Sequence, residues 1–260
     1  MPGTGETWNI IACSTQVNSK TGVAWLKARI GALALLSLLL LPLATASAVT
    51  DSPSARELLA LVRANQASQE RDLNGHLRMS TTEEKIVIPF RLFLRGNSIT
   101  YQFTDKPEAL ILHLGEKTSR LDRSTGSGRT EKITGAKLDD PVRGTDISYE
   151  DLALKFLYWN NAIVEKEKQT LMTRSCWIVR AIPSDKGESQ YDMVRLWIEP
   201  TGGLLQAECY SGGKPIRRFS VRKVQSAHGT GGYILKSMSI QRMDEKGKDR
   251  NPTYLEVQQQ

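Results

Sequence analysis

The chain has 260 residues, a formal net charge of +7 and a hydrophobic content of 40%. Its basic and acidic side chains are interspersed, whereas a nucleic-acid-binding protein usually gathers its basic residues in one stripe. We therefore expect no nucleic-acid partner, and a weak attraction to an anionic membrane surface or an acidic protein stays open. No segment repeats at a fixed period, and the length suits one domain with at most a small addition.

An export signal is predicted within residues 26–48. Lys27 and Arg29 form a basic flank, residues 30–43 form an apolar run, and Ala46-Ser47-Ala48 supplies the small residues that a signal peptidase requires. The apolar run is shorter than the ~20 residues of a membrane-spanning helix, so we favour cleavage over an uncleaved anchor. We expect residues 1–48 to be a signal peptide that is removed, and residues 49–260 to be a single domain exported to the periplasm.

Two cysteines, Cys176 and Cys209, lie in the part of the chain that is expected to be exported. An oxidising compartment favours a disulfide between such a pair, which would stabilise the fold by roughly 3–4 kcal/mol. The sequence does not show whether the two thiols lie within reach, so free thiols stay the alternative. Since no Cys-x-x-Cys spacing occurs, a redox-active or zinc-binding role is poorly supported.

The predicted elements begin with a helix over residues 54–68, where Pro53 and nearby serine or aspartate caps precede an apolar stripe. A series of strands follows, and residues 85–95 show the clearest alternation of apolar and polar positions. Gly96-Asn97 predicts a turn. Further strands are expected over residues 98–103, 110–114, 117–122 and 129–134.

The middle of the chain interrupts this series. Residues 139–146 resemble a loop, and residues 148–158 have helical spacing, with Ser148 and Asp151 placed as a capping box. Gly202-Gly203 and Gly212-Gly213 predict turns between later strands. Those strands are expected over residues 162–169, 171–182, 191–199, 204–210, 215–225 and 233–243, with residues 254–257 as a candidate for the last one.

About eleven strands and two helices are thus predicted, which is a mainly β fold with an antiparallel sheet large enough to curl. If the helices cover the sheet incompletely, its apolar face lines a cavity, which is the usual form of a lipid site. The alternative is that the same side chains simply form the core. The candidates for the cavity wall are Ile86, Ile88, Phe90, Leu92, Leu94, Ile99, Tyr101, Phe103, Leu110 and Leu112.

The sequence contains no recognisable catalytic or metal-binding constellation. His76, His113 and His228 do not stand in a metal-ligand spacing. The chain has no Gly-x-Ser-x-Gly elbow, and residues 211–214 are better explained as a hairpin turn than as a phosphate-binding loop. We therefore expect no catalytic residue, no metal and no cofactor, with an enzyme whose catalytic groups are scattered along the chain as an alternative.

Four segments in the second half of the chain carry a resemblance to a known family. Residues 144–152 are similar to a "GTDxSYEDL" segment of the outer-membrane lipoprotein-sorting proteins. Residues 176–183 resemble the next segment of that family, residues 195–208 resemble its "vWID…g.pl..e.y" hairpin, and residues 213–217 also fit. The family is placed with the periplasmic lipoprotein carriers of the LolA/LolB type.

The resemblance implies a fold, a function and partners. The fold would be an unclosed antiparallel β-barrel with a helical lid over a hydrophobic cavity. The protein would hold acyl chains of lipoproteins or lipids in that cavity and carry them through the periplasm towards the outer membrane. Its partners would be the acyl chains themselves, with donor and acceptor proteins at the inner and outer membranes, and we expect a monomer.

A second hypothesis is a periplasmic sensor, because a related fold serves in a regulator that binds a membrane protein and detects mislocalised lipoproteins. Such regulators usually carry an additional C-terminal domain, and we expect that this chain is too short to contain one. The resemblance assigns no specific binding residue, so the apolar strand positions remain the candidates for the cavity wall.

Overall fold

An antiparallel sheet dominates the structure, a computed structural model that describes residues 52–80, 84–185, 187–226, 233–243 and 251–259. The signal peptide predicted over residues 1–48 and His228 lie outside the described residues. Within these ranges the strands are β1 (Glu70–Ser80), β2 (Lys85–Arg95), β3 (Ser98–Phe103), β4 (Glu108–Leu114), β5 (Ser119–Thr125), β6 (Thr130–Lys132), β7 (Asn161–Val164), β8 (Gln169–Leu171), β9 (Arg174–Ile182), β10 (Met193–Ile198), β11 (Leu204–Ser211), β12 (Lys214–Ser226), β13 (Tyr233–Arg242) and β14 (Thr253–Gln259).

The helices are short and fall into two groups. Helix α1 (Ala55–Ala67) precedes the first strand. The other helices follow one another between β6 and β7: the 3₁₀ turns η1 (Gly135–Asp139) and η2 (Val142–Gly144), helix α2 (Tyr149–Ala153) and the 3₁₀ turn η3 (Lys155–Tyr158). Among the described residues, no helix has the length and apolar character needed to cross a membrane.

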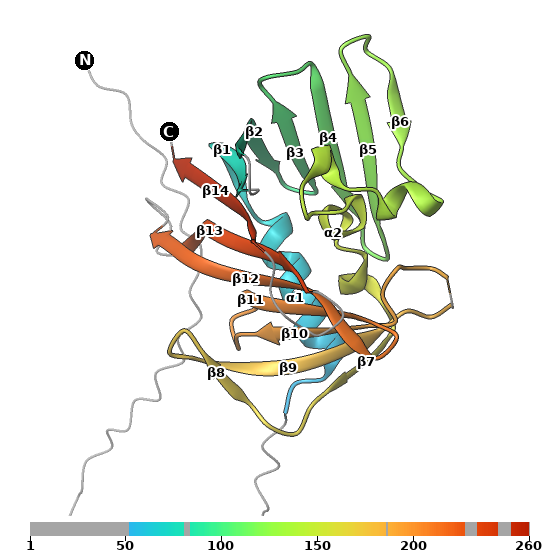
Figure 1. The fold of residues 1–260 in the computed structure, drawn as a ribbon. Helices are drawn as coiled ribbons and strands as arrows, with labels where there is room; N and C mark the ends of the chain where they lie inside the picture. The colour runs from blue at the N-terminus through green and yellow to red at the C-terminus, as the bar shows by residue number, and fades with distance from the viewer. Residues whose placement is uncertain (1–51, 81–83, 186, 227–232, 244–250, 260) are drawn as a thin grey trace, which may run out of the picture. The chain divides into compact units, whose positions relative to one another are not determined.

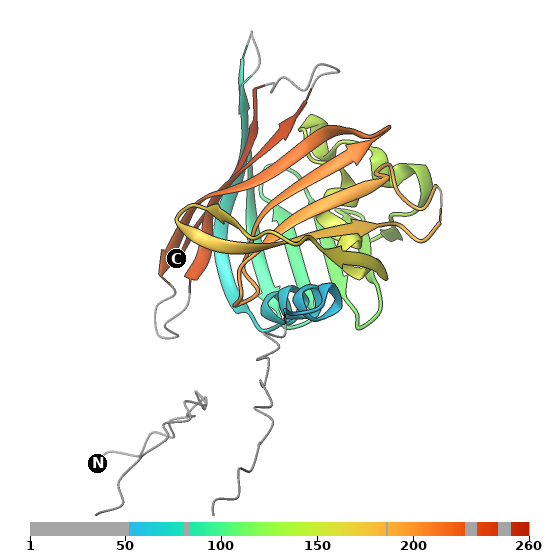
Figure 2. The same cartoon turned by 90° about the horizontal axis from the view of Figure 1, so that it is seen from below.

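The sheet has its first and last strands in the middle (Figure 1). Its strand order is β6-β5-β4-β3-β2-β1-β14-β13-β12-β11-β10-β9-β7, and β8 pairs with β9. Among the described strands every pairing is antiparallel, and only the β1–β14 pair joins strands that are distant in the sequence. In the described part of the chain β6 and β7 stand at the ends of this order and do not pair, so the sheet curls around the helices without closing (Figure 2).

Strict alternation along the first strands produces the two faces of the sheet. In β2, Ile88, Phe90, Leu92 and Leu94 are buried while the residues between them are more exposed. Cross-strand pairs such as Leu92 with Tyr101 place apolar side chains of neighbouring strands on the same face. This face is concave, and it packs against the helices.

The predicted helix boundaries agree closely at α1 and less well in the middle of the chain. Ser54 caps α1 and forms a capping box with Glu57, as Ser148 does with Asp151 at α2. The helix expected over residues 148–158 is instead broken at Leu154, whose φ of +52° ends α2 before η3 begins. A residue in the left-handed conformation cannot continue an α-helix. Glycine is the usual residue in that conformation, and because Leu154 stands there instead, the sequence does not indicate the break.

The described residues form fourteen strands, against about eleven expected and the candidate strand over residues 254–257, and two features account for the rest. Strand β1 was not predicted, because Gly75 stands at one of its inward positions where an apolar side chain would have completed the alternation. A Cβ at Gly75 would lie 2.6 Å from the Phe90 ring and 2.8 Å from the Glu256 carbonyl oxygen, so the strands approach too closely for a side chain. The strand expected over residues 171–182 is divided by a turn at Met172 and Thr173, both with positive φ.

Candidate functional site

The concave face of the sheet is the candidate site, because it gathers the side chains that the sequence proposed as a cavity wall. All ten lie on this face of β2, β3 and β4 and belong to or pack against one apolar cluster. Eight of them are at most 9% exposed, whereas Ile86 and Tyr101 stay partly exposed. The structure therefore brings the predicted residues together, and their contact with a lipid stays a prediction.

Two apolar clusters fill the concave side. The larger cluster joins buried side chains of β1–β5, β13 and β14 to those of residues 133–153. The smaller cluster joins buried side chains of α1, η3 and Trp159 to those of β9–β11. The helices thus cover different parts of the same face, α1 over one half and the 133–153 segment over the other.

Partly exposed apolar side chains lie where the two clusters meet. Leu154 and Phe219 contact both clusters and remain partly exposed. Leu152 and Tyr101 pack against the larger cluster and are partly exposed as well. Tyr101 meets the Phe90 ring edge-to-face at 5.5 Å, and burial raises the pKa of its hydroxyl to about 12. Exposed apolar surface on the inner side of a sheet is where a foreign hydrocarbon chain can gain contacts.

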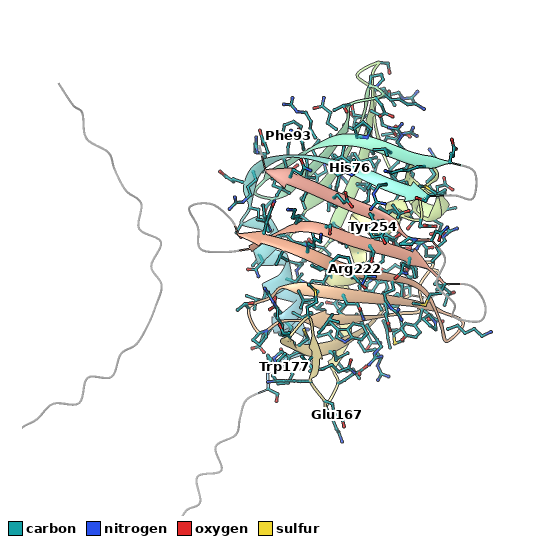
Figure 3. The ribbon with its side chains drawn as sticks, turned by 60° about the vertical axis from the view of Figure 1, so that its left-hand side comes forward. His76, Phe93, Glu167, Trp177, Arg222 and Tyr254 are labelled. Carbon is teal, nitrogen blue, oxygen red and sulfur yellow. The ribbon has the colours of Figure 1, made fainter. Side chains whose placement is uncertain are left out.

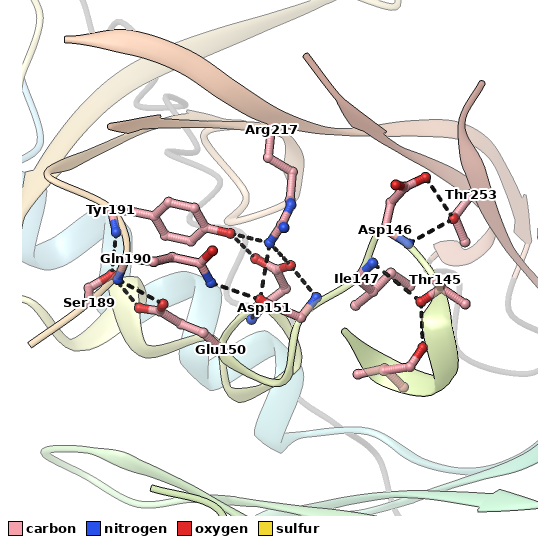
Figure 4. A network of polar contacts seen from close by, with 12 residues as sticks. Thr145, Asp146, Ile147, Glu150, Asp151, Ser189, Gln190, Tyr191, Arg217 and Thr253 are labelled. Carbon is pink, nitrogen blue, oxygen red and sulfur yellow. Dashed lines mark hydrogen bonds and ion pairs between the residues drawn. The ribbon is translucent and has the colours of Figure 1, made fainter. Parts of the chain in front are cut away.

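A buried polar network anchors α2 to the sheet (Figure 4). The Arg217 guanidinium of β12 forms an ion pair with Asp151 and donates a hydrogen bond to Ser148 Oγ at 3.0 Å. The Tyr191 hydroxyl donates to the second Asp151 oxygen at 2.5 Å and accepts a hydrogen bond from Arg217. Burial, with a smaller contribution from the Asp151 charge, raises the pKa of Tyr191 well above its usual value. Both Asp151 oxygens accept hydrogen bonds and the side chains are buried. The network therefore stabilises the position of α2 on the sheet and offers no free reactive group.

Further polar contacts extend this anchoring along the "GTDxSYEDL"-like segment. The Glu150 carboxylate accepts hydrogen bonds from Ser189 Oγ and from the Gln190 backbone N–H, the latter at 3.2 Å. Burial raises the pKa of Glu150, and these two hydrogen bonds oppose that shift. At the other end of the segment, Thr253 of β14 donates from its hydroxyl to Asp146 Oδ2 at 3.1 Å. The segment that carries the family resemblance is therefore a structural anchor between α2, β12 and β14.

The same stretch of chain is tied to the rim of the sheet. Arg143 of η2 donates two hydrogen bonds to Asp105 in the β3–β4 turn, at 2.8 and 2.6 Å, and lies 4.7 Å from the Phe103 ring centroid. These bonds are the main reason why the pKa of Asp105 is lowered. Such a bidentate pair fixes orientation as well as distance.

Sequence reasoning missed the most important of these residues. It treated the basic side chains together as charges interspersed with acidic ones and did not single out Arg217, which the structure leaves only 2% exposed. The sequence does contain an indication of this burial. Arg217 and Phe219 are two residues apart in β12 and therefore point to the same face, and Phe219 packs against both clusters. Glu150 and Asp151 are also buried, and each has its own partners, so they do not form an acid–base pair.

The disulfide that the sequence left open does not form in the structure, where Cys176 and Cys209 are both buried free thiols. Cys209 belongs to the smaller cluster, whereas Cys176 packs with Ile178 and Trp197 on the opposite face of the sheet. Strand β10 also lies between their strands. Two thiols on opposite faces of one sheet cannot bond without movement of the backbone.

Several other titratable side chains form ion pairs on the outer face. His76 Nε2 lies 2.9 Å from Glu256, and the Arg78 guanidinium lies 3.0 Å from the same carboxylate and 4.4 Å from the Tyr254 ring centroid (Figure 3). His113 pairs with Asp122 at 3.0 Å. In the described ranges of the chain, no three His, Cys, Asp or Glu side chains are grouped in a way that could hold a metal ion.

Comparisons with known proteins agree with this architecture. Among curated proteins no match was found. Solved structures with a similar fold include a DUF1329 family protein from Desulfovibrio piger ATCC 29098, with 15% identity, a TM-score of 0.61 and coverage of 78% of this chain and 90% of that chain. A putative outer membrane lipoprotein-sorting protein domain from Vibrio parahaemolyticus has 15% identity, a TM-score of 0.60 and coverage of 76% and 88%. A LolA superfamily protein from Nitrosomonas europaea has 13% identity, a TM-score of 0.57 and coverage of 80% and 92%.

These similarities show the fold. The expected class, an unclosed antiparallel β-barrel covered by helices, is confirmed, and the fold is similar to that of the LolA superfamily protein. A protein-family model described as "Uncharacterized protein" matches residues 125–260, which is just over half of the chain. The chain therefore belongs to the family that this model describes, and it has a LolA-like fold.

Proposed function

We propose that this protein is a periplasmic carrier that holds acyl chains of lipoproteins or lipids on its concave face and carries them towards the outer membrane. One observation carries the proposal: two inward apolar side chains that contact both clusters, Leu154 and Phe219, stay partly exposed. The fold it shares with a lipoprotein-sorting domain and a LolA superfamily protein supports the same role. A periplasmic location fits the signal peptide that the sequence predicts over residues 1–48.

The physical basis is the transfer of hydrocarbon from water to an apolar surface. Each buried methylene group contributes about 0.8 kcal/mol, so a 16-carbon chain that is fully covered gains on the order of 12 kcal/mol before the costs of association. A carrier with an incompletely filled apolar face can hold such a chain in solution and release it to a more apolar acceptor. Donor and acceptor proteins at the two membranes are the partners that this role requires.

Direct binding of an acyl chain tests the proposal. Native mass spectrometry of residues 49–260, incubated with palmitate and with a palmitoylated peptide, should show one-to-one complexes, and the unacylated peptide should not bind. Retention of neither probe, together with no displacement of a fluorescent fatty acid, contradicts a carrier role.

A charged substitution at the cluster boundary locates the site. Phe219→Glu should reduce palmitate affinity at least tenfold, because a carboxylate would have to be desolvated beside the chain. Val87→Glu is the matched control, since Val87 is 48% exposed and alternates with the inward-facing residues of β2. Circular dichroism checks that both variants stay folded. Equal affinity of two folded variants would place the acyl chain elsewhere.

A further inference from the structure

A cavity of about 440 Å³ lies beside the β3–β4 turn and is separate in character from the apolar concave face. The cavity is largely open to solvent. Five of its seven lining residues are polar or charged, and of the seven only Phe103 is shared with the predicted acyl-chain wall. The lining residues are Arg91, Gln102, Phe103, Thr104, Asp105, Lys106 and Pro107. Because Arg91, Asp105 and Lys106 place charged groups in this lining, the cavity suits a charged ligand better than an acyl chain.

The charges around this cavity are unbalanced. The side chains of Arg91 and Lys106 have no hydrogen-bond or ion-pair partner among the residues that the structure describes. The only carboxylate in the lining belongs to Asp105, and both of its oxygens accept hydrogen bonds from Arg143. The nearby Glu108 is paired with Arg123 at 2.7 Å. After these pairs are formed, the two side chains of Arg91 and Lys106 leave an excess of positive charge at the cavity.

The polar groups of the cavity are held on a fixed frame. Arg91 and Gln102 are cross-strand neighbours of β2 and β3, so their side chains lie on the same face. The turn is held by the Thr104 backbone N–H, which donates to the Pro89 carbonyl at 3.1 Å. Pro107 forms a rigid wall, and Gly126 approaches it so closely that a Cβ there would lie 2.7 Å from the proline ring. Little of the frame needs to be ordered when a ligand binds.

We propose that this cavity is a binding site for a phosphate group, with Arg91 and Lys106 as its cations and with Gln102 and Thr104 as hydrogen-bond donors. A guanidinium and an ammonium group from different elements can contact different oxygens of one tetrahedral oxyanion. The volume exceeds that of one phosphate, so the site has room for a small group attached to it. The inference does not depend on the binding of acyl chains to the concave face.

Titration of ¹⁵N-labelled protein followed by amide chemical shifts tests the site. The probes are inorganic phosphate, glycerol 3-phosphate and dihexanoyl phosphatidylglycerol below its micelle concentration, with glycerol as the uncharged control. We expect shifts at the amides of Arg91, Gln102, Thr104 and Lys106 with the three phosphate probes, none with glycerol, and weaker binding at high salt. Tighter binding of the lipid than of glycerol 3-phosphate assigns the site to a lipid headgroup, and equal binding assigns it to a water-soluble phosphate.

Variants separate a specific site from general attraction to a basic protein. Arg91→Gln and Lys106→Gln should each weaken phosphate-probe binding by about five- to tenfold, which corresponds to one charge-assisted hydrogen bond near the surface. Lys117→Gln is the matched control, because Lys117 is an exposed lysine in the β4–β5 turn without a partner among the described residues. Equal weakening by all three substitutions, or no shifts at the cavity amides of the wild-type protein, overturns the proposal.

Discussion

Two covers lie on the concave face, and they are attached by different kinds of interaction. Residues 133–158 are joined to the sheet through a buried ion pair, a buried carboxylate and a bidentate pair at the rim. Helix α1 is held by the apolar side chains Ala55, Leu58, Leu59 and Val62 and by two side-chain bonds, from Arg63 to the Leu157 carbonyl and from Asn65 to the Thr201 carbonyl.

This difference indicates which cover can make room for a ligand. Removing the 133–158 segment would leave buried charges without partners, which costs several kcal/mol. Displacing α1 exposes mainly apolar surface, and an acyl chain can cover the same surface again. Under the proposed function, we therefore expect α1 to move and the 133–158 segment to stay in place.

The largest effect is expected from breaking the buried ion pair. Asp151→Ala leaves the Arg217 guanidinium buried without its counter-charge, so the free energy of unfolding should fall by about 3–5 kcal/mol. Urea unfolding measures the loss. Asp139→Ala is the control, because Asp139 is an exposed acid in η1 and its removal should change stability by less than about 0.5 kcal/mol.

A double substitution sharpens this test. Replacing both partners, with Asp151→Leu and Arg217→Met, removes the unpaired charge and should restore much of the stability lost by Asp151→Ala. If the double variant is as unstable as the single one, packing around α2 and the Tyr191 and Ser148 hydrogen bonds hold the segment, and the ion pair does not.

Arg217 also marks the limit of what the sequence could predict. The alternation in β2, β3 and β4 predicted the inward face correctly, because each side chain there packs against its neighbours and the period is regular. The capping box of α2 was also predicted, and a serine or aspartate cap was indicated before α1, since caps are local patterns of three or four residues. These features depend on interactions between residues that are close in the sequence, so they can be recognised from one sequence alone.

The features that the sequence missed or left open depend on contacts across the fold. Arg217 is buried because Asp151, 66 positions away, neutralises it, and no local pattern reports that partner. Strand β1 lacks a regular apolar alternation because the Phe90 ring occupies the space where a side chain at position 75 would lie, so that glycine stands there. The thiols of Cys176 and Cys209 stay apart because strand parity places them on opposite faces. In each of these three cases the outcome depends on residues that are far apart in the sequence and close together, or kept apart, in the fold.

The next largest effect tests the attachment of α1. Leu59→Ala removes a side chain that is 2% exposed, which should lower stability by about 2–4 kcal/mol through lost contacts and a cavity. Hydrogen exchange should accelerate at α1 amides more than at β12 amides, because α1 opens locally. Leu61→Ala is the control on the same helix, since Leu61 is 37% exposed and its loss should cost much less. Equal acceleration in α1 and β12 would show that the two covers unfold together.

A smaller effect is expected at the start of α1. The Ser54 side chain accepts a hydrogen bond from the Glu57 backbone N–H at 3.2 Å, and Glu57 accepts one from the Ser54 backbone N–H at 2.7 Å. Ser54→Ala should lower stability by about 1 kcal/mol, the usual cost of a lost N-cap, while Ser68→Ala at the other end should cost less. Under the proposed function, Ser54→Ala should also accelerate palmitate uptake in stopped-flow fluorescence. Unchanged uptake in a folded, destabilised variant would argue that α1 does not gate the site.

The smallest effect concerns the tie between Arg143 and Asp105 at the rim, and it depends on pH. Hydrogen bonds from Arg143 lower the pKa of Asp105 below its ordinary value of 3.8, so the folded protein binds this proton less readily than the unfolded chain does. The stabilisation is therefore complete above about pH 5 and is lost as the pH falls through the folded-state pKa. Because Asp105 is about one-third exposed, the loss should be only about 0.5 kcal/mol. Arg143→Gln should lower stability at pH 7 by a similar amount and reduce the difference between pH 7 and pH 3, measured by urea unfolding at both values. An unchanged pH dependence in this variant would mean that the rim tie contributes nothing to holding the 133–158 segment in place.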